Sequence, residues 1–460
     1  MTAEHVEKCR RGRRDSLLHY AAMRTSDRLG LPAFFRWLLP LSLVLQIACI
    51  GIFHQYRVRP GNDHFEFGWE MGRVARSIAL GHGFSSPYEG TTGPTAWEPP
   101  LYPYLMAGVF KLFGIYTVAS AWVLLIINSF FATLTSIPIY RIAQKTFDQR
   151  IARWSAFGWA LNPYMWYWSI HWLWDTTFAP FLLACIFLLA LELAQIGMSP
   201  QLREAGTQRR FPNWQLWFLF GVLYGIGALA NPTMLAFLPF CGLWIWVQRY
   251  RRGLPSLGGV IFSSLVFFAA ISPWVIRNYE MFGRFVFLRD DFGLQFRLGN
   301  WKGADGILMA YLQPNLNNLE LRNFQSMGEL AYAESCKREA FDWVKENPTR
   351  FAVISLKRFF YYWNGVPRPT SSTLPVDFRT SGFLATSVLA LWGVGRAVRQ
   401  ERPGAWLYAG LIIFYPLIYY FVYPHARYRH PIEPELTVLI VFLLCEAVER
   451  KKPEVERIVD

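Results

Sequence analysis

Three acidic residues, Asp63, Glu66 and Glu70, follow directly after the first long apolar run of the chain. Glu66 and Glu70 belong to a polar series at helical spacing, and an apolar series runs one residue behind it: Phe67, Met71, Val74 and Ile78. This pattern predicts a short amphipathic helix that lies on a bilayer surface and holds carboxylates at the boundary between water and lipid. A carboxylate in that partly dry position can serve as a general base. The alternative is that these acids only form the solvated edge of the helix.

A fourth acid, Asp175, lies at the start of a later apolar run, in the sequence HWLWDTTF. An ionisable residue in such a run is functional by default, because burying it in lipid is costly. The alternative is a structural hydrogen bond or ion pair, for which His171, one helical turn earlier, is a candidate partner.

Basic residues gather in two other places. Arg427, Arg429 and His430 fall together in the short segment YPHARYRHP, and Arg277 follows another apolar run in SPWVIRNY. Arginine forks match the oxygens of a phosphate group, so these residues are candidates for a phosphate clamp. The alternative for both places is that the arginines anchor the protein to lipid headgroups.

The elements that must position these residues are membrane helices. The chain has 460 residues, of which 53% are hydrophobic and 17% aromatic, too apolar a composition for an ordinary soluble enzyme. About ten apolar runs are long enough to cross a bilayer. They cover residues 33–53, 117–140, 152–168, 173–194, 214–231, 233–248, 256–275, 381–395, 405–423 and 434–448, with 101–113 interfacial. We therefore expect an all-α integral membrane protein of about ten spans.

The charge pattern predicts the orientation. The leader carries KCRRGRR and several short loops are basic, whereas the alternate loops near 169–172 and 231–232 carry no Lys or Arg. The positive-inside rule then places both termini in the cytoplasm. Contact with anionic lipid explains most of the net charge of +14, so no nucleic acid partner is implied.

This topology divides the chain into five parts. They are a cytoplasmic basic leader (1–32), an N-terminal transmembrane module (33–275) with a first outer loop (54–116), a long outer loop (276–380), C-terminal transmembrane helices (381–448) and a cytoplasmic tail (449–460). In the long outer loop, Asn347-Pro348 predicts the start of a second surface helix, TRFAVISLKRFFYYW. All the candidate acids and arginines then lie on the outer face, where a carboxylate could activate a hydroxyl while arginines hold a phosphate leaving group.

At these residues the chain resembles the C-type (GT-C) membrane glycosyltransferases that use polyprenyl phosphate sugars, in the branch of glycosyltransferase family 39 and the dolichyl-phosphate-mannose-protein mannosyltransferases. The matching segments are ARSIALGHGF with PPLYPYLMAGVFKLFG, then WLWDTTFAPFLL, ANPTMLAFLPF, SPWVIRNYEMFGRFV with FRLGN, and HARYRHPIEP. Their order and spacing extend over nearly the whole chain. Taken together the series is fairly specific, although no single segment is decisive.

The resemblance implies a dolichyl- or polyprenyl-phosphate sugar donor, inverting transfer on the outer face and a catalytic carboxylate in the first outer loop. Relatives often carry an Asp-Glu pair there, which in this chain falls near Phe67-Gly68 and is absent. We favour Glu70 as the base, then Glu66 and Asp63. Asp175 and the loop with Arg427 and Arg429 match family positions. Where relatives often have a basic residue before Pro-Pro, this chain has Glu98, so an expected phosphate contact is missing.

We therefore predict a glycosyltransferase of the bacterial inner (plasma) membrane, with its active site on the periplasmic side. The partners would be a polyprenyl-phosphate-linked sugar, membrane lipids and an acceptor that is a protein, lipid or glycan. A divalent metal, Mg²⁺ or Mn²⁺, is a candidate cofactor, since carboxylates and phosphate together invite one. Two alternatives stay open: a polyprenyl-linked polysaccharide ligase, and a lipid or sugar transporter without chemistry, for which charges at mid-membrane and paired broken helices would be expected.

Overall fold

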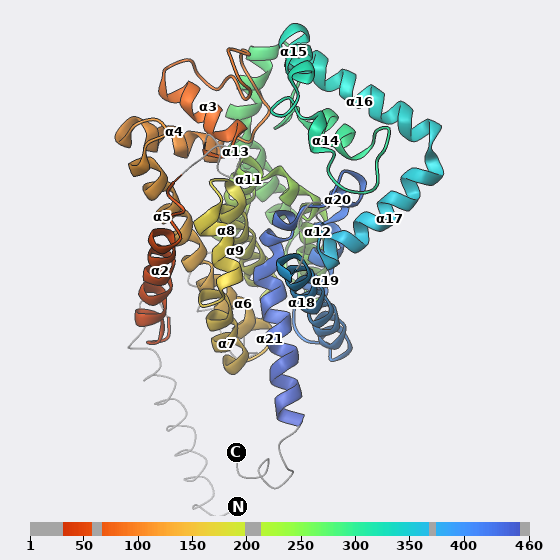
Figure 1. Cartoon of the computed structure of the whole chain (residues 1–460). Coiled ribbons are helices and arrows are strands. Elements are labelled where there is room, and N and C mark those ends of the chain that lie inside the picture. The colour runs from red at the N-terminus through yellow and green to blue at the C-terminus, as the bar shows by residue number, and fades with distance from the viewer. Residues whose placement is uncertain (1–30, 58–66, 198–212, 368–373, 451–460) are drawn as a thin grey trace, which may run out of the picture.

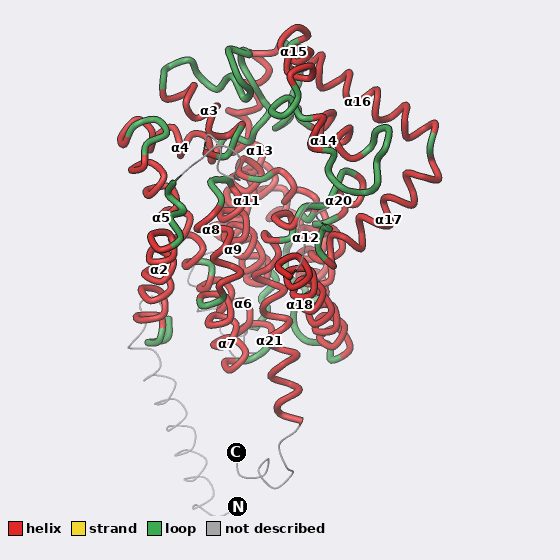
Figure 2. Tube along the Cα trace, viewed as in Figure 1, coloured by secondary structure: helices red, strands yellow, loops and turns green. Residues whose placement is uncertain are grey.

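The computed structural model describes residues 31–57, 67–197, 213–367 and 374–450. Within these ranges the regular structure is helical, and the only strand-like pairing is an isolated bridge between Ser85 and Pro94. Long helices run side by side through the body of the molecule, and shorter helices and loops gather at one end, which we call the cavity end (Figure 1, Figure 2). The prediction of an all-α protein is confirmed for the described residues.

The helices of the body come from both halves of the chain. They are α2 (Phe35–Ile52), α5 (Val118–Leu134), α6 (Ser136–Thr146), α7 (Gln149–Ala160), α8 (Pro163–His171), α9 (Phe178–Leu193), α11 (Asn213–Ala230), α12 (Leu238–Tyr250), α13 (Leu257–Phe282), α18 (Leu374–Arg399), α19 (Ala405–Phe414), α20 (Leu417–Phe421) and α21 (Glu433–Arg450). α11 packs on α13, α6 on α7 and α18 on α21. Gly221 and Gly225 allow the first of these contacts, because a Cβ on either would come within 2.5 Å of α13 atoms.

Five helical stretches of the described chain are long and apolar enough to cross a membrane: Phe35–Ile52, Val118–Thr146, Asp175–Leu193, Asn213–Ala230 and Leu257–Phe282. Large apolar side chains of α13, such as Leu265 and Phe268, are exposed, as expected of a helix that faces lipid. The protein is an integral membrane protein, and five of the ten predicted spans coincide with helices that could cross the membrane.

The other five predicted spans coincide with helices that are interrupted, shorter or more polar. The run at 152–168 is divided between α7 and α8, because Asn162 caps α8 and Pro163 occupies its first turn. The run at 233–248 begins as the 3₁₀ helix η3 (Pro232–Ala236), and the run at 405–423 is divided between α19 and α20. The runs at 381–395 and 434–448 lie within α18 and α21.

The cavity end is built from both predicted outer loops. Its helices are α3 (Glu70–Ala79), α4 (Leu101–Phe113), α14 (Phe292–Gly299), α15 (Asn318–Met327), α16 (Glu329–Glu346) and α17 (Pro348–Asn364). Residues of the first loop, including Tyr88 and Trp97, share a second hydrophobic core with α14, α15 and α16. The two loops, about 200 residues apart, therefore form one packed layer.

The second predicted surface helix is α17, which begins at Pro348 as expected. Its two charged residues differ in environment. Lys357 is exposed, but Arg358 is completely buried and donates hydrogen bonds to the carbonyl of Phe421 at 2.8 Å and to the side chain of Asn300 at 3.0 Å. Arg358 thus attaches α17 to α14 and α20 instead of facing a lipid surface.

Candidate active site

A cavity of about 730 Å³ opens at the cavity end of the bundle. Its walls come from segments that are far apart in the sequence: the start of α3, the 172–176 segment before α9, the 231–236 turn, the 287–295 segment before and into α14, and the 418–431 region before α21. Its charged lining residues are Glu70, Glu98, Asp175, Arg289, Asp291 and Arg427. Acids and arginines therefore face one shared space, as the sequence predicted.

Glu70 is the candidate base that the structure places in this cavity, and it is the first residue of α3. Its carboxylate accepts a hydrogen bond of 2.7 Å from the amide of Asn315, whose carbonyl oxygen accepts one from Arg73. Asn315 therefore holds the Glu70 carboxylate in place. Asp63 and Glu66, the two other candidate bases, lie outside the described residues.

The Glu70 carboxyl is poised for proton transfer. Burial raises its pKa above the ordinary value, and this outweighs the hydrogen bond from its own backbone and the attraction of Arg73, Arg427 and Arg289. A base with a raised pKa holds a proton more tightly, which suits the abstraction of a proton from a hydroxyl group.

The backbone in front of Glu70 is unusual. Phe67, Gly68 and Trp69 all have positive φ, at 57°, 90° and 53°, which non-glycine residues adopt only at a cost of about 1–3 kcal/mol each. This stretch explains why the predicted helix begins at Glu70 and not at Glu66. At Gly68 a Cβ would collide with the carbonyl oxygen of Leu173, so only glycine fits between α3 and the segment that carries Asp175.

Phe67 and Gly68, where relatives often have an acidic pair, serve packing here. The Phe67 ring is buried and stacks on Tyr116 with 5.3 Å between ring centroids, and it meets Phe110 edge-on. This position therefore supplies an anchor for the start of α3, and the acid that faces the cavity comes three residues after Phe67.

Asp175 is buried at the cavity and begins the 3₁₀ helix η2 (Asp175–Thr177) that leads into α9. Its side chain is hydrogen-bonded to Asn231, which also caps η3 by accepting from the Thr233 amide at 3.1 Å. Arg427 and Arg289 are the nearest cations in its electrostatic environment. Asp175 is therefore a cavity acid that a fixed amide side chain orients.

Arg427 is the one member of the predicted clamp that lines the cavity. Its guanidinium lies over the rings of Trp174 and Trp172, at 4.5 and 5.4 Å from their centroids. Within the described part of the chain no carboxylate forms an ion pair with it. A charged group held by aromatic faces and aimed into a cavity can bind an anion.

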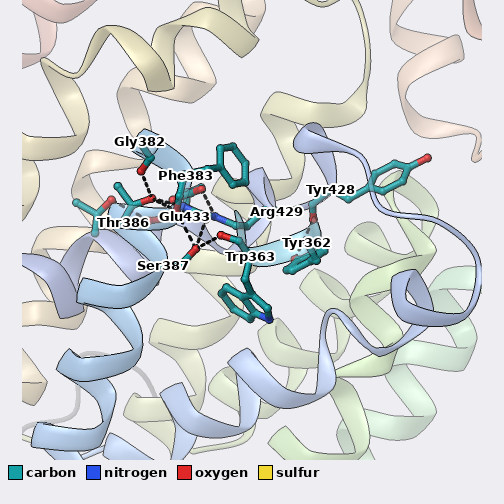
Figure 3. Close-up of polar contacts among 10 residues, drawn as sticks. Tyr362, Trp363, Gly382, Phe383, Thr386, Ser387, Tyr428, Arg429 and Glu433 are labelled. Atoms are coloured by element: carbon teal, nitrogen blue, oxygen red, sulfur yellow. Dashed lines mark hydrogen bonds and ion pairs between the residues drawn. The ribbon is translucent and has the colours of Figure 1, made fainter. Parts of the chain in front are cut away.

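The structure places Arg429 away from the cavity, against α18. Its Nε donates to Glu433 at 2.6 Å, and its other nitrogens donate to the Phe383 carbonyl at 3.1 Å and to the hydroxyls of Ser387 and Thr386, each at 2.6 Å (Figure 3). Arg429 is 1% exposed. All its donors serve the packing of α18 on the start of α21, which disagrees with the predicted contact to a lipid phosphate.

His430 and Arg277 also lie off the cavity wall. His430 is buried between the rings of Trp159 and Trp168. Arg277, near the end of α13, donates to the carbonyls of Thr95 at 2.6 Å and Phe84 at 2.7 Å, and its guanidinium also lies over the Trp274 ring. The predicted phosphate-binding role of Arg277 gives way to a structural one, because it holds the first loop onto the bundle.

Arg289 lines the cavity but was not among the residues predicted from the sequence. It lies beside Glu98, the acid that stands where relatives often have a basic residue. Its Nη2 is 2.7 Å from an Asp291 oxygen and 3.4 Å from Oε2 of Glu98, while its Nε donates to the Trp97 carbonyl at 2.8 Å. Asp291 and Glu98 raise the pKa of Arg289 against the effect of burial, so it is always charged. The charged run Arg289-Asp290-Asp291, in the long outer loop after Arg277, is the signal that could have identified it.

The described residues contain no group of three or more His, Cys, Asp or Glu side chains arranged to hold a metal ion. The described residues therefore offer no ligand group for the divalent metal that the sequence left open as a candidate cofactor.

Comparison with known proteins gives one family match, which covers part of the chain. Residues 97–276, from the residue before Glu98 to a point within α13, match the family model described as dolichyl-phosphate-mannose-protein mannosyltransferase. A comparison with curated proteins found no match. The match falls in the same family that the sequence segments resemble.

Two groups of solved structures are distantly similar. The oligosaccharyltransferase of Archaeoglobus fulgidus, in complex with Zn and sulfate, has 15% sequence identity and a TM-score of 0.48, covering 90% of this chain and 49% of its own. ArnT from Cupriavidus metallidurans, bound to undecaprenyl phosphate, has 12% identity and a TM-score of 0.40, covering 90% of this chain and 77% of its own. The chain thus spans about half the length of the archaeal enzyme. These similarities are low, and the assignment rests on the family match.

Proposed function

We propose that the protein transfers a sugar from a polyprenyl phosphate carrier to a hydroxyl group of an acceptor, with inversion at the sugar carbon. The observation that carries the proposal is the single cavity in which Glu70 and Asp175 face Arg289 and Arg427. An acid to activate a hydroxyl and cations to hold a phosphate are the two requirements of this reaction.

In this mechanism Glu70 is the general base. It takes the proton of the acceptor hydroxyl while the acceptor oxygen attacks the anomeric carbon of the sugar. The bond between that carbon and the phosphate oxygen breaks, and its electron pair leaves with the polyprenyl phosphate. Asn315 holds Glu70 in position for the attack through its hydrogen bond of 2.7 Å. Because one displacement occurs at the carbon, the configuration inverts.

The leaving phosphate is stabilised by Arg427 and Arg289. Arg427 is supported on Trp172 and Trp174, which fixes its plane without neutralising its charge. Arg289 reaches the cavity from the segment before α14 and is oriented by Asp291. Asp175, oriented by Asn231, is placed to accept hydrogen bonds from the hydroxyl groups of the sugar. Arg429, His430 and Arg277 take no part in this mechanism and support the fold.

In the proposed orientation, the cavity end faces the outer side of the plasma membrane, which is the periplasm in a bacterium. The support for this orientation is the charge pattern, since the basic loops between the spans fall at the opposite end of the spans from Glu70 and Arg427. A lipid-linked donor would then reach the cavity from the bilayer, and the acceptor from the water side.

The test uses the purified full-length protein in lipid nanodiscs, mixed with polyprenyl phosphate that carries radiolabelled mannose or glucose and with total envelope acceptor material. Release of free polyprenyl phosphate and transfer of label to an acceptor support the proposal. Absence of turnover with either donor, together with movement of the labelled lipid between leaflets in liposomes, would show a transporter instead.

A further inference from the structure

Glu98 is a buried acid in the cavity with an unusual lack of partners. It precedes Pro99-Pro100, is 3% exposed and lines the cavity wall. Its Oε2 atom has no hydrogen-bond partner in the structure. A buried carboxylate in that position costs free energy unless it is paired or carries a proton.

The only cation beside Glu98 in the described chain is already committed. Arg289 forms its close ion pair with Asp291, at 2.7 Å, and approaches Oε2 of Glu98 only to 3.4 Å. The other charged and titratable groups around Glu98 are Glu70 on α3, Asp175 at the start of η2 and Tyr88 in the first loop. These neighbours add negative charge or none, so one positive charge must serve several carboxyl groups.

We propose that Glu98 is a neutral carboxylic acid in the free protein and that its O–H donates a hydrogen bond to the phosphate of the lipid carrier, beside Arg289. This inference deepens the proposed function and rests on it, since the ligand is the same lipid phosphate. It assigns to Glu98 a binding role that an ionised carboxylate could not have, because an ionised Glu98 would repel a phosphate bound beside it.

The proton on Glu98 has a measurable consequence. Burial, assisted by the nearby Glu70 and Asp291 carboxylates, raises the pKa of Glu98 to about 8 against the opposing effect of Arg289. The neutral form binds, so raising the pH removes the required proton and weakens binding. The phosphate itself carries two charges throughout the range above pH 7, because its second pKa is about 6. Between pH 7 and 9.5 the Kd should therefore rise about 30-fold if the free group titrates near 8.

The experiment measures binding of tritiated polyprenyl phosphate to the full-length protein in nanodiscs at pH 7, 8, 9 and 9.5. Four proteins are compared: wild type, Glu98→Gln, Glu98→Ala and the control Glu89→Gln. Glu89 is an exposed acid on the same loop. Wild type and Glu89→Gln should weaken about 30-fold across the range. Glu98→Gln, which keeps a neutral N–H donor, should bind at all pH values within about threefold of wild type at pH 7.

Glu98→Ala should bind at least about tenfold more weakly than wild type at pH 7 and show no pH dependence in this range. A wild-type Kd that does not change between pH 7 and 9.5 overturns the inference, whether or not the variants fold. So does tighter binding by Glu98→Ala than by wild type at pH 7, because Glu98 would then be an ionised, repelling group. If wild type and all variants fail to bind polyprenyl phosphate at every pH, it is the proposed function that fails.

Discussion

Arg427 and Arg429 are two residues apart and chemically identical, but the structure predicts opposite consequences when each is replaced by alanine. Arg427 faces the cavity over Trp172 and Trp174, whereas Arg429 is buried against Glu433 and α18. Removing Arg427 should weaken binding of the lipid phosphate and leave the fold intact. Removing Arg429 should destabilise the fold.

The magnitudes follow from the contacts. Arg429 is 1% exposed and Glu433 is 2% exposed, so Arg429→Ala leaves a buried carboxylate without its cation, at a cost of about 3–5 kcal/mol. Arg427 forms no ion pair in the described chain, so Arg427→Ala costs its contacts with aromatic rings, about 1 kcal/mol of stability, and a longer-range attraction for Asp175. The Arg427→Ala variant also lacks the charge-assisted hydrogen bonds to the phosphate, about 1.5–3 kcal/mol of binding free energy, so its Kd for the lipid phosphate should be about 10- to 150-fold higher.

Two assays on the same nanodisc samples separate these effects: thermal unfolding followed by intrinsic fluorescence, and binding of tritiated polyprenyl phosphate to the folded fraction at pH 7. Arg429→Met is a further control, because it keeps the volume of the buried stem but not the ion pair, and it should also unfold early. The reasoning is refuted if Arg429→Ala melts like wild type and binds weakly, or if Arg427→Ala binds like wild type.

Three further predictions concern other parts of the site. Gly68→Ala should abolish most activity with little loss of apolar packing, because the new Cβ collides with the Leu173 carbonyl and displaces the start of α3. The control is Gly81→Ala, where the space around the new Cβ is open, and equal activities of the two variants would contradict the account. Arg277→Met should make the first loop open more easily, because the carbonyls of Thr95 and Phe84 lose their hydrogen-bond donor. Amide hydrogen exchange at residues 84–97 should then be faster, and unchanged exchange there would count against a structural role of Arg277. In the pH profile of kcat/KM, the midpoint of the acid limb should lie above 4.5, the ordinary pKa of glutamate, because Glu70 must be deprotonated to act and burial raises its pKa. Activity is lost as the pH falls through that raised pKa. A midpoint at or below 4.5 would speak against Glu70 as the base.

Much of the fold could be predicted from local patterns. Apolar run length located α2, α11 and α13 to within a few residues at most ends, and Asn347-Pro348 marked the start of α17. The break at Asn162-Pro163 carries the same capping signature, so it was readable, although the apolar residues on either side were interpreted as one span. Run length alone cannot separate one long helix from two short ones when both are apolar.

The site was predicted in part, because tertiary contacts decide which polar residues reach the cavity. Glu70, Asp175 and Arg427 were predicted from charge type and position, and the fold brings them together. The difference between Arg427 and Arg429 depends on the turn of a 3₁₀ helix against α18, which no local pattern encodes. Arg289 was missed for the same reason, since its place beside Glu98 depends on two loops that meet across about 190 residues of sequence.

The central claim is that Glu70 removes the proton of the acceptor while the arginines hold the lipid phosphate. The most direct test compares Glu70→Gln with wild type and with the control Glu89→Gln in single-turnover transfer from a radiolabelled polyprenyl phosphate sugar, with binding of polyprenyl phosphate measured on the same samples. The account predicts that Glu70→Gln binds the lipid phosphate as tightly as wild type and releases label at least about 100-fold more slowly. Transfer by Glu70→Gln at the wild-type rate would contradict it.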